Sequence, residues 1–266
     1  YIGISGLESS YEQYLRGRRG VKRVYVDARG NEKGQYKNGR YDTASVAGQD
    51  LISSIDLKLQ QYGELLMRNK RGAIVAIEPS TGEILTMISA PSYDPNLLTG
   101  REFSKNYGPL AINKNKPLFN RAIRSKYPPG STFKTVQALI GQQENVIAPH
   151  TVFACNKSLV KCHWHPTADL QRSIQHSCNP YYFNVFRRII YQNKLVIDDS
   201  TTTVTKGSDG KIGFKKWRQH LLSFGLGAKT GVDLNNEKAG NVPSLSFYNK
   251  RFGEGKWKFS NIYSLR

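Results

Sequence analysis

Long apolar runs, cysteines and acidic residues are all scarce in this chain of 266 residues. No stretch approaches the roughly 18 apolar residues that a membrane-spanning helix requires, so the sequence predicts no such helix within it. Three cysteines are too few for a disulfide scaffold. Hydrophobic residues still make up 38% of the chain, which is enough to bury a substantial core. We therefore expect one large globular domain, or one domain with a smaller appendage.

The shortage of acidic residues leaves the chain strongly basic. Lys and Arg number 39 against 20 Asp and Glu, which gives a formal net charge of +19. Such a charge favours an anionic partner, and nucleic acid, anionic lipid and a pyrophosphate-bearing substrate would all fit. The basic residues are scattered along the chain, however, and neither a zinc-finger nor an RNA-binding aromatic signature accompanies them. We therefore expect no nucleic-acid partner.

Composition changes near residue 50. Residues 1–50 are rich in Gly, Tyr, Arg and Lys, and their glycines interrupt every potential long helix. This favours short strands and turns. We predict a small domain over residues 1–50 and a larger one over residues 51–266.

The larger domain mixes strand and helix signals, which predicts an α+β fold with an antiparallel sheet and surrounding helices. Residues 51–55 have a short strand signal, and Asp56 is expected to cap the helix that follows. Two β-prone runs flank a turn at residues 78–82 and predict a hairpin of the sheet. These runs are residues 73–77 and 83–89. Helices are predicted at residues 131–142, 169–177, 181–191 and 215–224, with an exposed loop or hairpin at residues 198–213.

A serine and a lysine three residues apart follow a segment that disfavours helix. In residues 128–134 (PPGSTFK), two prolines and a glycine hold the chain out of helical conformation, so Ser131 is expected in the first turn of a helix. Lys134 then lies on the same helix face. A serine hydroxyl becomes an effective nucleophile once a base takes its proton, and a lysine can be that base. We interpret Ser131 as a nucleophile and Lys134 as its base.

Both residues also have an ordinary structural interpretation. Ser131 could simply cap a helix, with Lys134 solvated, because Ser-x-x-Lys often arises by chance. The context favours catalysis: Asn120-Arg121-Ala122-Ile123, the Tyr-Pro-Pro-Gly entry and a later Ser177-Cys178-Asn179 match, in order, the first two motifs of the penicillin-recognising serine enzymes. The ordinary alternative for Ser177 and Asn179 is a pair of helix-capping residues.

Further motifs extend the match over nearly the whole chain. They are residues 6–8 (GLE) with Tyr11, Glu12, Leu15, Gly17 and Gly20; residues 54–56 (SID) with Gln60; residues 76–85 (AIEPSTGEIL); residues 93–96 (YDPN); residues 224–227 (FGLG); residues 230–234 (TGVDL); and residues 241–243 (NVP). Together they resemble a class B penicillin-binding protein, from the end of its non-catalytic pedestal, or dimerisation domain, into its transpeptidase domain. The last three motifs are most similar to the elongation-type, cell-shape subgroup.

This resemblance implies the penicillin-recognising serine transpeptidase or β-lactamase-like fold, incomplete at its C-terminus. It implies a peptidoglycan D,D-transpeptidase that attacks the D-Ala-D-Ala end of a stem peptide and forms an acyl-enzyme on Ser131. Ser177 would relay a proton toward the leaving amine, and Asn179 would hold Lys134 and the substrate amide. A β-lactam would acylate the same serine, and catalysis would need no cofactor.

Partners and location follow from the same resemblance. The partners would be stem peptides or their lipid-linked precursor, β-lactams, a membrane glycosyltransferase and other proteins of the elongation complex. The catalytic domain would be periplasmic and anchored in the inner membrane. We expect the anchor to lie outside the printed sequence, which we interpret as a fragment.

The family's third motif, Lys-Thr/Ser-Gly on a strand, invites assignment to Lys229-Thr230-Gly231. We reject that assignment, because residues 225–228 (GLGA) indicate the glycine-rich end of a helix rather than a strand. The family also places far more chain between its second and third motifs. We expect the true third motif to lie beyond the printed sequence.

All three cysteines fall in or just before the second motif. Cys155, Cys162, His165 and Cys178 could together bind one structural zinc ion, which would use every cysteine and leave no open position for water. His163 lies in the same segment, and the spacing is not that of a standard zinc finger. The alternative is a disulfide between Cys155 and Cys162 with Cys178 as a free, buried thiol.

Two rival functions remain at the level of sequence. A β-lactam sensor or a β-lactamase would share Ser-x-x-Lys but should lack the pedestal motif of residues 6–20. A non-catalytic scaffold of the wall-synthesis complex would not need an intact set of catalytic residues, and this chain keeps all four of them: Ser131, Lys134, Ser177 and Asn179.

Overall fold

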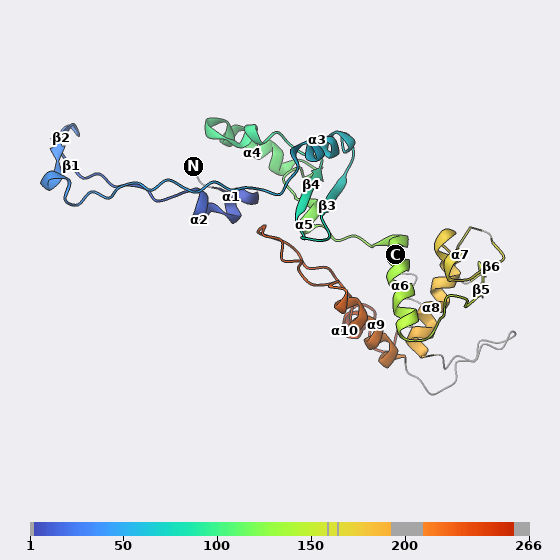
Figure 1. The fold of residues 1–266 in the computed structure, drawn as a ribbon. Coiled ribbons are helices and arrows are strands. Elements are labelled where there is room, and N and C mark those ends of the chain that lie inside the picture. The colour runs from blue at the N-terminus through green and yellow to red at the C-terminus, as the bar shows by residue number, and fades with distance from the viewer. Residues whose placement is uncertain (1–2, 159, 164, 193–209, 258–266) are drawn as a thin grey trace. The chain divides into compact units, whose positions relative to one another are not determined.

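The computed structural model describes residues 3–158, 160–163, 165–192 and 210–257. Packing divides the chain into two compact units, the first of residues 1–125 with 231–238 and the second of residues 126–230 with 239–266. Both units contain helices and strands (Figure 1), as the sequence predicts. The domain boundary predicted near residue 50 is a separate expectation, which this division does not test. No described helix has both the length and the apolar character needed to cross a membrane.

Residues 3–50 form short elements of the first unit. Strands β1 (Val24–Val26) and β2 (Glu32–Gln35) pair antiparallel, and two isolated bridges continue the pairing. Two short helices, α1 (Gly6–Ser10) and α2 (Glu12–Leu15), add to the strands and turns predicted there. Gly17 follows α2 with a φ of +65°, and a Cβ at this position would lie 2.2 Å from the carbonyl oxygen of Val46. A glycine is therefore needed where this chain segment turns.

The predicted hairpin and its neighbouring helix are present. Strands β3 (Gly72–Ile77) and β4 (Ile84–Ala90) pair antiparallel, and helix α3 (Leu57–Leu66) packs on β4. The side chain of Asp56 caps α3 by accepting from the backbone N–H of Leu59 at 2.9 Å. The strand predicted at residues 51–55 is wrong. That segment is almost wholly exposed and pairs with no strand in the described part of the chain.

The rest of the first unit consists of short helices, one of which packs on the hairpin. Helix α5 (Arg121–Arg124) packs on β3 and β4, and helix α4 (Phe103–Ile112) precedes it. The guanidinium of Arg121 is buried and donates to the backbone carbonyls of Asn115, Lys116 and Phe119. Short 3-10 helices occur at Tyr36–Gly39, Pro95–Leu98 and Gly100–Glu102.

The second unit contains the largest core. Helix α8 (Asn179–Tyr191) packs between α6 (Phe133–Gln143) and α9 (Lys211–Ser223). Its buried face includes Tyr181, Val185 and Ile189, all with 0% exposure. The remaining elements are a 3-10 turn (Gly130–Thr132), β5 (Phe153–Ala154) paired with β6 (Thr167–Ala168), α7 (Leu170–Gln175) and α10 (Leu245–Phe252).

All four helices predicted for this unit are present, and their ends differ from the predicted ones by up to four residues, most at the start of α9. Helix α9 begins at Lys211, four residues before the predicted start, because its buried face of Phe214, Trp217 and Leu221 continues the helical spacing toward the N-terminus. Residues 211–213, predicted as loop, are therefore helical. The rest of that predicted loop, up to residue 209, lies outside the described residues.

A small polar cluster ties the end of α6 to α8 and α9. Glu144, at the C-terminal end of α6, lies 2.7 Å from His220 Nε2 and 3.5 Å from Lys216 Nζ. It also accepts from the side-chain amide of Gln192 at 3.4 Å. The hydrogen bond with His220 holds the pKa of Glu144 below its ordinary value. A carboxylate with a lowered folded-state pKa stabilises the fold above its unfolded pKa, and that contribution is lost as pH falls through the folded value.

We predict that Glu144→Gln lowers the melting temperature at pH 7 by about 2–4 °C, because a contact of this kind contributes on the order of 1 kcal/mol. The difference from wild type should shrink as pH falls below about 4, where the carboxylate of the wild type becomes protonated. Thermal unfolding of the full-length protein from pH 3 to pH 8 measures this. Glu102→Gln, which alters an exposed ion pair, is the matched control and should change little. If the melting-temperature difference between Glu144→Gln and wild type does not vary with pH, the stabilising role assigned to the Glu144 carboxylate is contradicted.

Candidate active site

Ser131 lies in a tight turn that leads into α6. Gly130 has a φ of +64°, and the 3-10 turn Gly130–Thr132 continues directly into the helix. The hydroxyl of Thr132 donates to the carbonyl of Pro129 at 2.6 Å, which fixes the turn. The predicted position of Ser131 at the start of a helix is therefore correct, although its own turn is 3-10 rather than α. Ser131 is exposed, and Lys134, in the first turn of α6, is half-buried.

The second motif forms the turn between α7 and α8. Ser177 has a φ of +50°, a left-handed conformation that residues other than glycine seldom adopt. The fully buried Cys178 caps α8, with its Sγ atom 3.4 Å from the backbone N of Tyr181. Asn179 is the first residue of the helix. Unusual backbone conformations of this type concentrate at functional sites.

Lys134 joins the two motifs. Its Nζ atom lies 2.8 Å from Ser177 Oγ, 2.5 Å from the Ser177 carbonyl oxygen and 2.6 Å from Asn179 Oδ1. Ser177 Oγ in turn lies 3.0 Å from Ser131 Oγ. The structure therefore brings together all four residues that the sequence suggested, and it links Ser131 to Lys134 through the hydroxyl of Ser177.

This arrangement suits proton transfer from Ser131. A hydroxyl can donate and accept at once, so Ser177 can pass a proton between the other two side chains. A lysine amine that accepts the proton would leave Ser131 as an activated nucleophile. General-base catalysis requires the base to lie within hydrogen-bond reach of the proton that it takes, directly or through one intermediate group. The separations from Ser131 Oγ to Ser177 Oγ and from Ser177 Oγ to Lys134 Nζ both meet this requirement.

Tyr182 is a contact of Lys134 that sequence reasoning missed. Its ring centroid lies 5.8 Å from Lys134 Nζ, and its buried hydroxyl is 3.2 Å from Ser173 Oγ. Burial raises the pKa of Tyr182, which keeps it neutral. The available signal was its place in α8, because a residue three positions after Asn179 lies on the same helix face.

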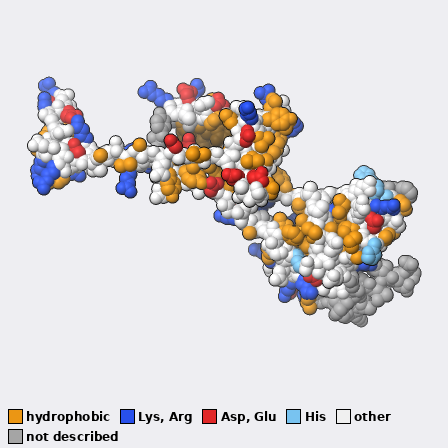
Figure 2. Space-filling model, viewed as in Figure 1, with side chains coloured by type: hydrophobic (Ala, Val, Ile, Leu, Met, Phe, Trp, Pro, Cys, Tyr) orange, Lys and Arg blue, Asp and Glu red, His pale blue; other side chains and the backbone are white. Residues whose placement is uncertain are grey.

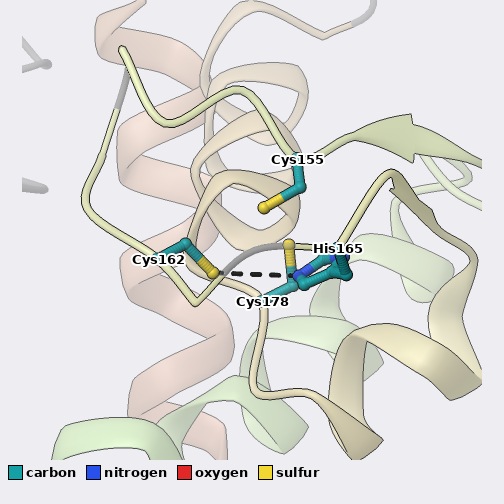
Figure 3. Close-up of side chains that lie close together, drawn as sticks. All are labelled: Cys155, Cys162, His165 and Cys178. Carbon is teal, nitrogen blue, oxygen red and sulfur yellow. Dashed lines mark hydrogen bonds between the residues drawn. The ribbon is translucent and has the colours of Figure 1, made fainter.

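Four side chains with metal-ligand chemistry meet beside the second motif. The ligand atoms of Cys155, Cys162, His165 and Cys178 all lie within 4.8 Å of one another, and their side chains converge in Figure 3. Cys162 Sγ is 3.8 Å from His165 Nε2. All three cysteines are free thiols in the structure. Burial raises the pKa of Cys178 to about 12 and also raises that of Cys155. His163 is not one of these four residues. Its backbone carbonyl oxygen lies 3.6 Å from Cys155 Sγ.

Residues 229–231 lie in an irregular segment that follows α9, and none of them is in a strand. The local structure thus agrees with the reason given for rejecting this tripeptide as the third motif. On the face drawn in Figure 2, Lys and Arg side chains occupy several separate places rather than one continuous stripe. This matches the scattered pattern of basic residues in the sequence.

Comparisons with known proteins give the family. Residues 72–264 match the penicillin-binding protein transpeptidase domain, and residues 1–53 match the penicillin-binding protein dimerisation domain. The chain belongs to the penicillin-binding transpeptidase family. The resemblance predicted from the motifs is thereby confirmed, and so is the fold class that it implied.

Curated relatives of this transpeptidase family align with nearly all of the chain. The peptidoglycan D,D-transpeptidase MrdA of Escherichia coli K12 is 32% identical over 268 residues, which cover 94% of this chain and 37% of the relative. The MrdA protein of Acinetobacter baumannii is 33% identical over 275 residues, which cover 99% of this chain and 37% of the relative. The chain thus spans little more than a third of the length of these relatives.

Solved structures of penicillin-binding proteins share the fold. Pseudomonas aeruginosa PBP2 in complex with WCK 5153 has a TM-score of 0.71 and 28% identity, covering 99% of this chain and 52% of that one. Helicobacter pylori PBP2 in complex with MreC has a TM-score of 0.71 and 27% identity, covering 98% of this chain and 46% of that one.

Proposed function

We propose that this chain carries the acylation site of a serine-type peptidoglycan D,D-transpeptidase that acts in cell elongation. The observation that carries the proposal is the hydrogen-bonded series Ser131, Ser177 and Lys134. The names of the MrdA relatives, which cover nearly the whole chain, support the substrate class. The match of residues 1–53 to a dimerisation domain favours this function over a β-lactamase or a β-lactam sensor, for which that domain was not expected.

The proposed chemistry is one acyl transfer in two steps. The Ser131 hydroxyl loses its proton to Lys134, through Ser177, while Oγ bonds to the carbonyl carbon between the two terminal D-alanines. The C–N bond then breaks, and the departing D-alanine amine takes the proton back. An amine of a neighbouring peptidoglycan strand then attacks the ester carbonyl carbon. The C–O bond to Ser131 breaks, and the proton that the amine loses returns to Ser131 Oγ. These side chains supply the nucleophile and the base, so the reaction as proposed needs no cofactor.

Asn179 has a supporting role in this scheme. Asn179 holds Lys134 through its Oδ1 atom, and we propose that the same amide side chain contacts the amide of the stem peptide. A β-lactam would acylate Ser131 by the same route, because its strained amide replaces the D-Ala-D-Ala bond. Among the rival functions, a non-catalytic scaffold would have no need of the complete series of hydrogen bonds.

We also infer the partners and the location of this protein from its relatives. The solved complex of Helicobacter pylori PBP2 with MreC supports an elongation-complex partner for this protein. We also propose a membrane glycosyltransferase as a partner, and an inner-membrane anchor that places the catalytic domain in the periplasm. The formal charge of +19 suits lipid-linked precursors, which carry pyrophosphate.

We predict that a fluorescent penicillin forms a covalent adduct with Ser131 in the full-length protein. Ser131→Ala should abolish labelling because the nucleophile is lost. Lys134→Ala should slow it by roughly two orders of magnitude or more, the usual contribution of a general base. Gel fluorescence over time measures both rates, and melting curves confirm that each variant folds. Labelling that survives Ser131→Ala unchanged would contradict the nucleophile assignment. Near-normal labelling of Lys134→Ala would require a different base.

We further propose that the four clustered side chains bind one structural zinc ion. In a tetrahedral zinc site, sulfur lies about 2.3 Å and nitrogen about 2.0–2.1 Å from the ion. One sulfur ligand and one nitrogen ligand are then about 3.6 Å apart. The observed separation of 3.8 Å between Cys162 Sγ and His165 Nε2 fits this value. Three thiolates and one imidazole complete the coordination of zinc, so the ion would brace the fold rather than activate water.

We predict that purified, tag-free, full-length protein contains about one equivalent of zinc by elemental analysis, as a single tetrahedral site requires. Chelation should lower the melting temperature, because the metal binds only the native state. Cys178→Ser should lower both the zinc content and the melting temperature, and it should slow acylation through Ser177 and Asn179. The disulfide alternative predicts sensitivity to reductant instead, with no effect of Cys178→Ser. Absence of zinc together with a mapped Cys155–Cys162 bridge would contradict the proposal.

A further inference from the structure

The side-chain amide of Asn179 makes hydrogen bonds on both of its sides. Its Oδ1 accepts from Lys134 Nζ at 2.6 Å, and its Nδ2 donates to the backbone carbonyl of Lys161 at 2.8 Å. A carbonyl only accepts, so the Lys161 contact selects the orientation of the amide in which Nδ2 faces Lys161 and Oδ1 faces Lys134. If the amide turned over, it would present an N–H group to Lys134. Lys134 would then lose one of its acceptors.

Lys161 belongs to the segment that carries the clustered thiols. We name residues 155–165 the cysteine loop, of which 159 and 164 lie outside the described residues. The next residue after Lys161 is Cys162, and the residue before Asn179 is Cys178, and both are members of the metal-ligand cluster. The cluster therefore brings together the immediate neighbours of the two residues whose hydrogen bond orients the amide.

The base of the cysteine loop is also fixed. The backbone N–H of Cys155 donates to the carbonyl of Pro166 at 3.1 Å, and the short pair of strands β5 and β6 closes the loop. Lys161 itself has an exposed side chain, so its backbone carbonyl is the part of the residue that contacts the site. A backbone group has no signature in a sequence, which is why motif reasoning did not include this residue.

We propose that the cysteine loop is a positioning element for acyl transfer, in which the carbonyl of Lys161 keeps Asn179 Oδ1 facing Lys134. This inference rests on the proposed role of Lys134 in acylation. It assigns the loop an effect on the reaction rate that is separate from its effect on stability. One hydrogen bond of this kind is enough to change a rate by about two- to tenfold.

Two substitutions at one position isolate the backbone contribution. Lys161→Ala and Lys161→Gly both remove the side chain, but only glycine frees the backbone that carries the carbonyl. Acylation by a fluorescent penicillin, measured on the full-length protein, should be about two- to tenfold slower in Lys161→Gly than in Lys161→Ala. Ser158→Ala and Ser158→Gly form the matched control, because they make the same comparison elsewhere in the loop. The Ser158 pair should label at equal rates.

The same pair of Lys161 substitutions is then compared in an Asn179→Ala background. If the carbonyl acts through the amide, the difference between Lys161→Gly and Lys161→Ala disappears there, while any difference in melting temperature persists. Two results would overturn the inference. One is equal acylation rates of Lys161→Gly and Lys161→Ala when Asn179 is present, and the other is an unchanged difference between these rates in the Asn179→Ala background. If Lys161→Gly does not fold, Cys162→Ser replaces it in the same cycle, compared with wild type. Failure of the wild type to label at all would instead contradict the proposed function.

Discussion

The hydrogen bonds of Lys134 are the interaction on which the second unit's site depends. Removing an amine partly from water is costly unless hydrogen-bond acceptors replace the lost solvent. Here the acceptors are two oxygen atoms of Ser177 and one of Asn179. Because Lys134 belongs to α6 and its acceptors lie at the start of α8, the same contacts join the two helices and bring Ser177 Oγ to Ser131 Oγ.

The backbone at Ser177 shows what this arrangement costs. A non-glycine residue with a φ of +50° occupies a sparsely populated conformation, which persists when the surroundings impose it. On one side, the backbone N–H of Ser177 donates to the carbonyl oxygen of Ile174 at 3.1 Å. On the other side, the buried Cys178 caps α8, one face of which is fully buried. The strained residue is thus held between α7 and α8 with its hydroxyl and carbonyl both directed to Lys134.

Sequence reasoning succeeded where local patterns determine the structure. The β3–β4 hairpin follows from two β-prone runs and a turn, and α6 follows from the residues that block helix before Gly130. It failed at residues 51–55, which form no strand and pair with none in the described part of the chain, although their apolar residues favour one. It also missed Tyr182 and the carbonyl of Lys161, because such contacts depend on how α8 and the cysteine loop pack. Tertiary packing, rather than propensity, decides these features.

The central claim is that Ser131 reaches Lys134 through the hydroxyl of Ser177. Ser177→Ala and Ser177→Gly both remove that hydroxyl, but glycine also relieves the left-handed backbone conformation. The most direct measurement is the rate of penicillin acylation of these two variants in the full-length protein, alongside their melting temperatures. The account predicts that both acylate roughly two orders of magnitude more slowly than wild type, even where Ser177→Gly is as stable. A folded Ser177→Gly variant that acylates at the wild-type rate would contradict it.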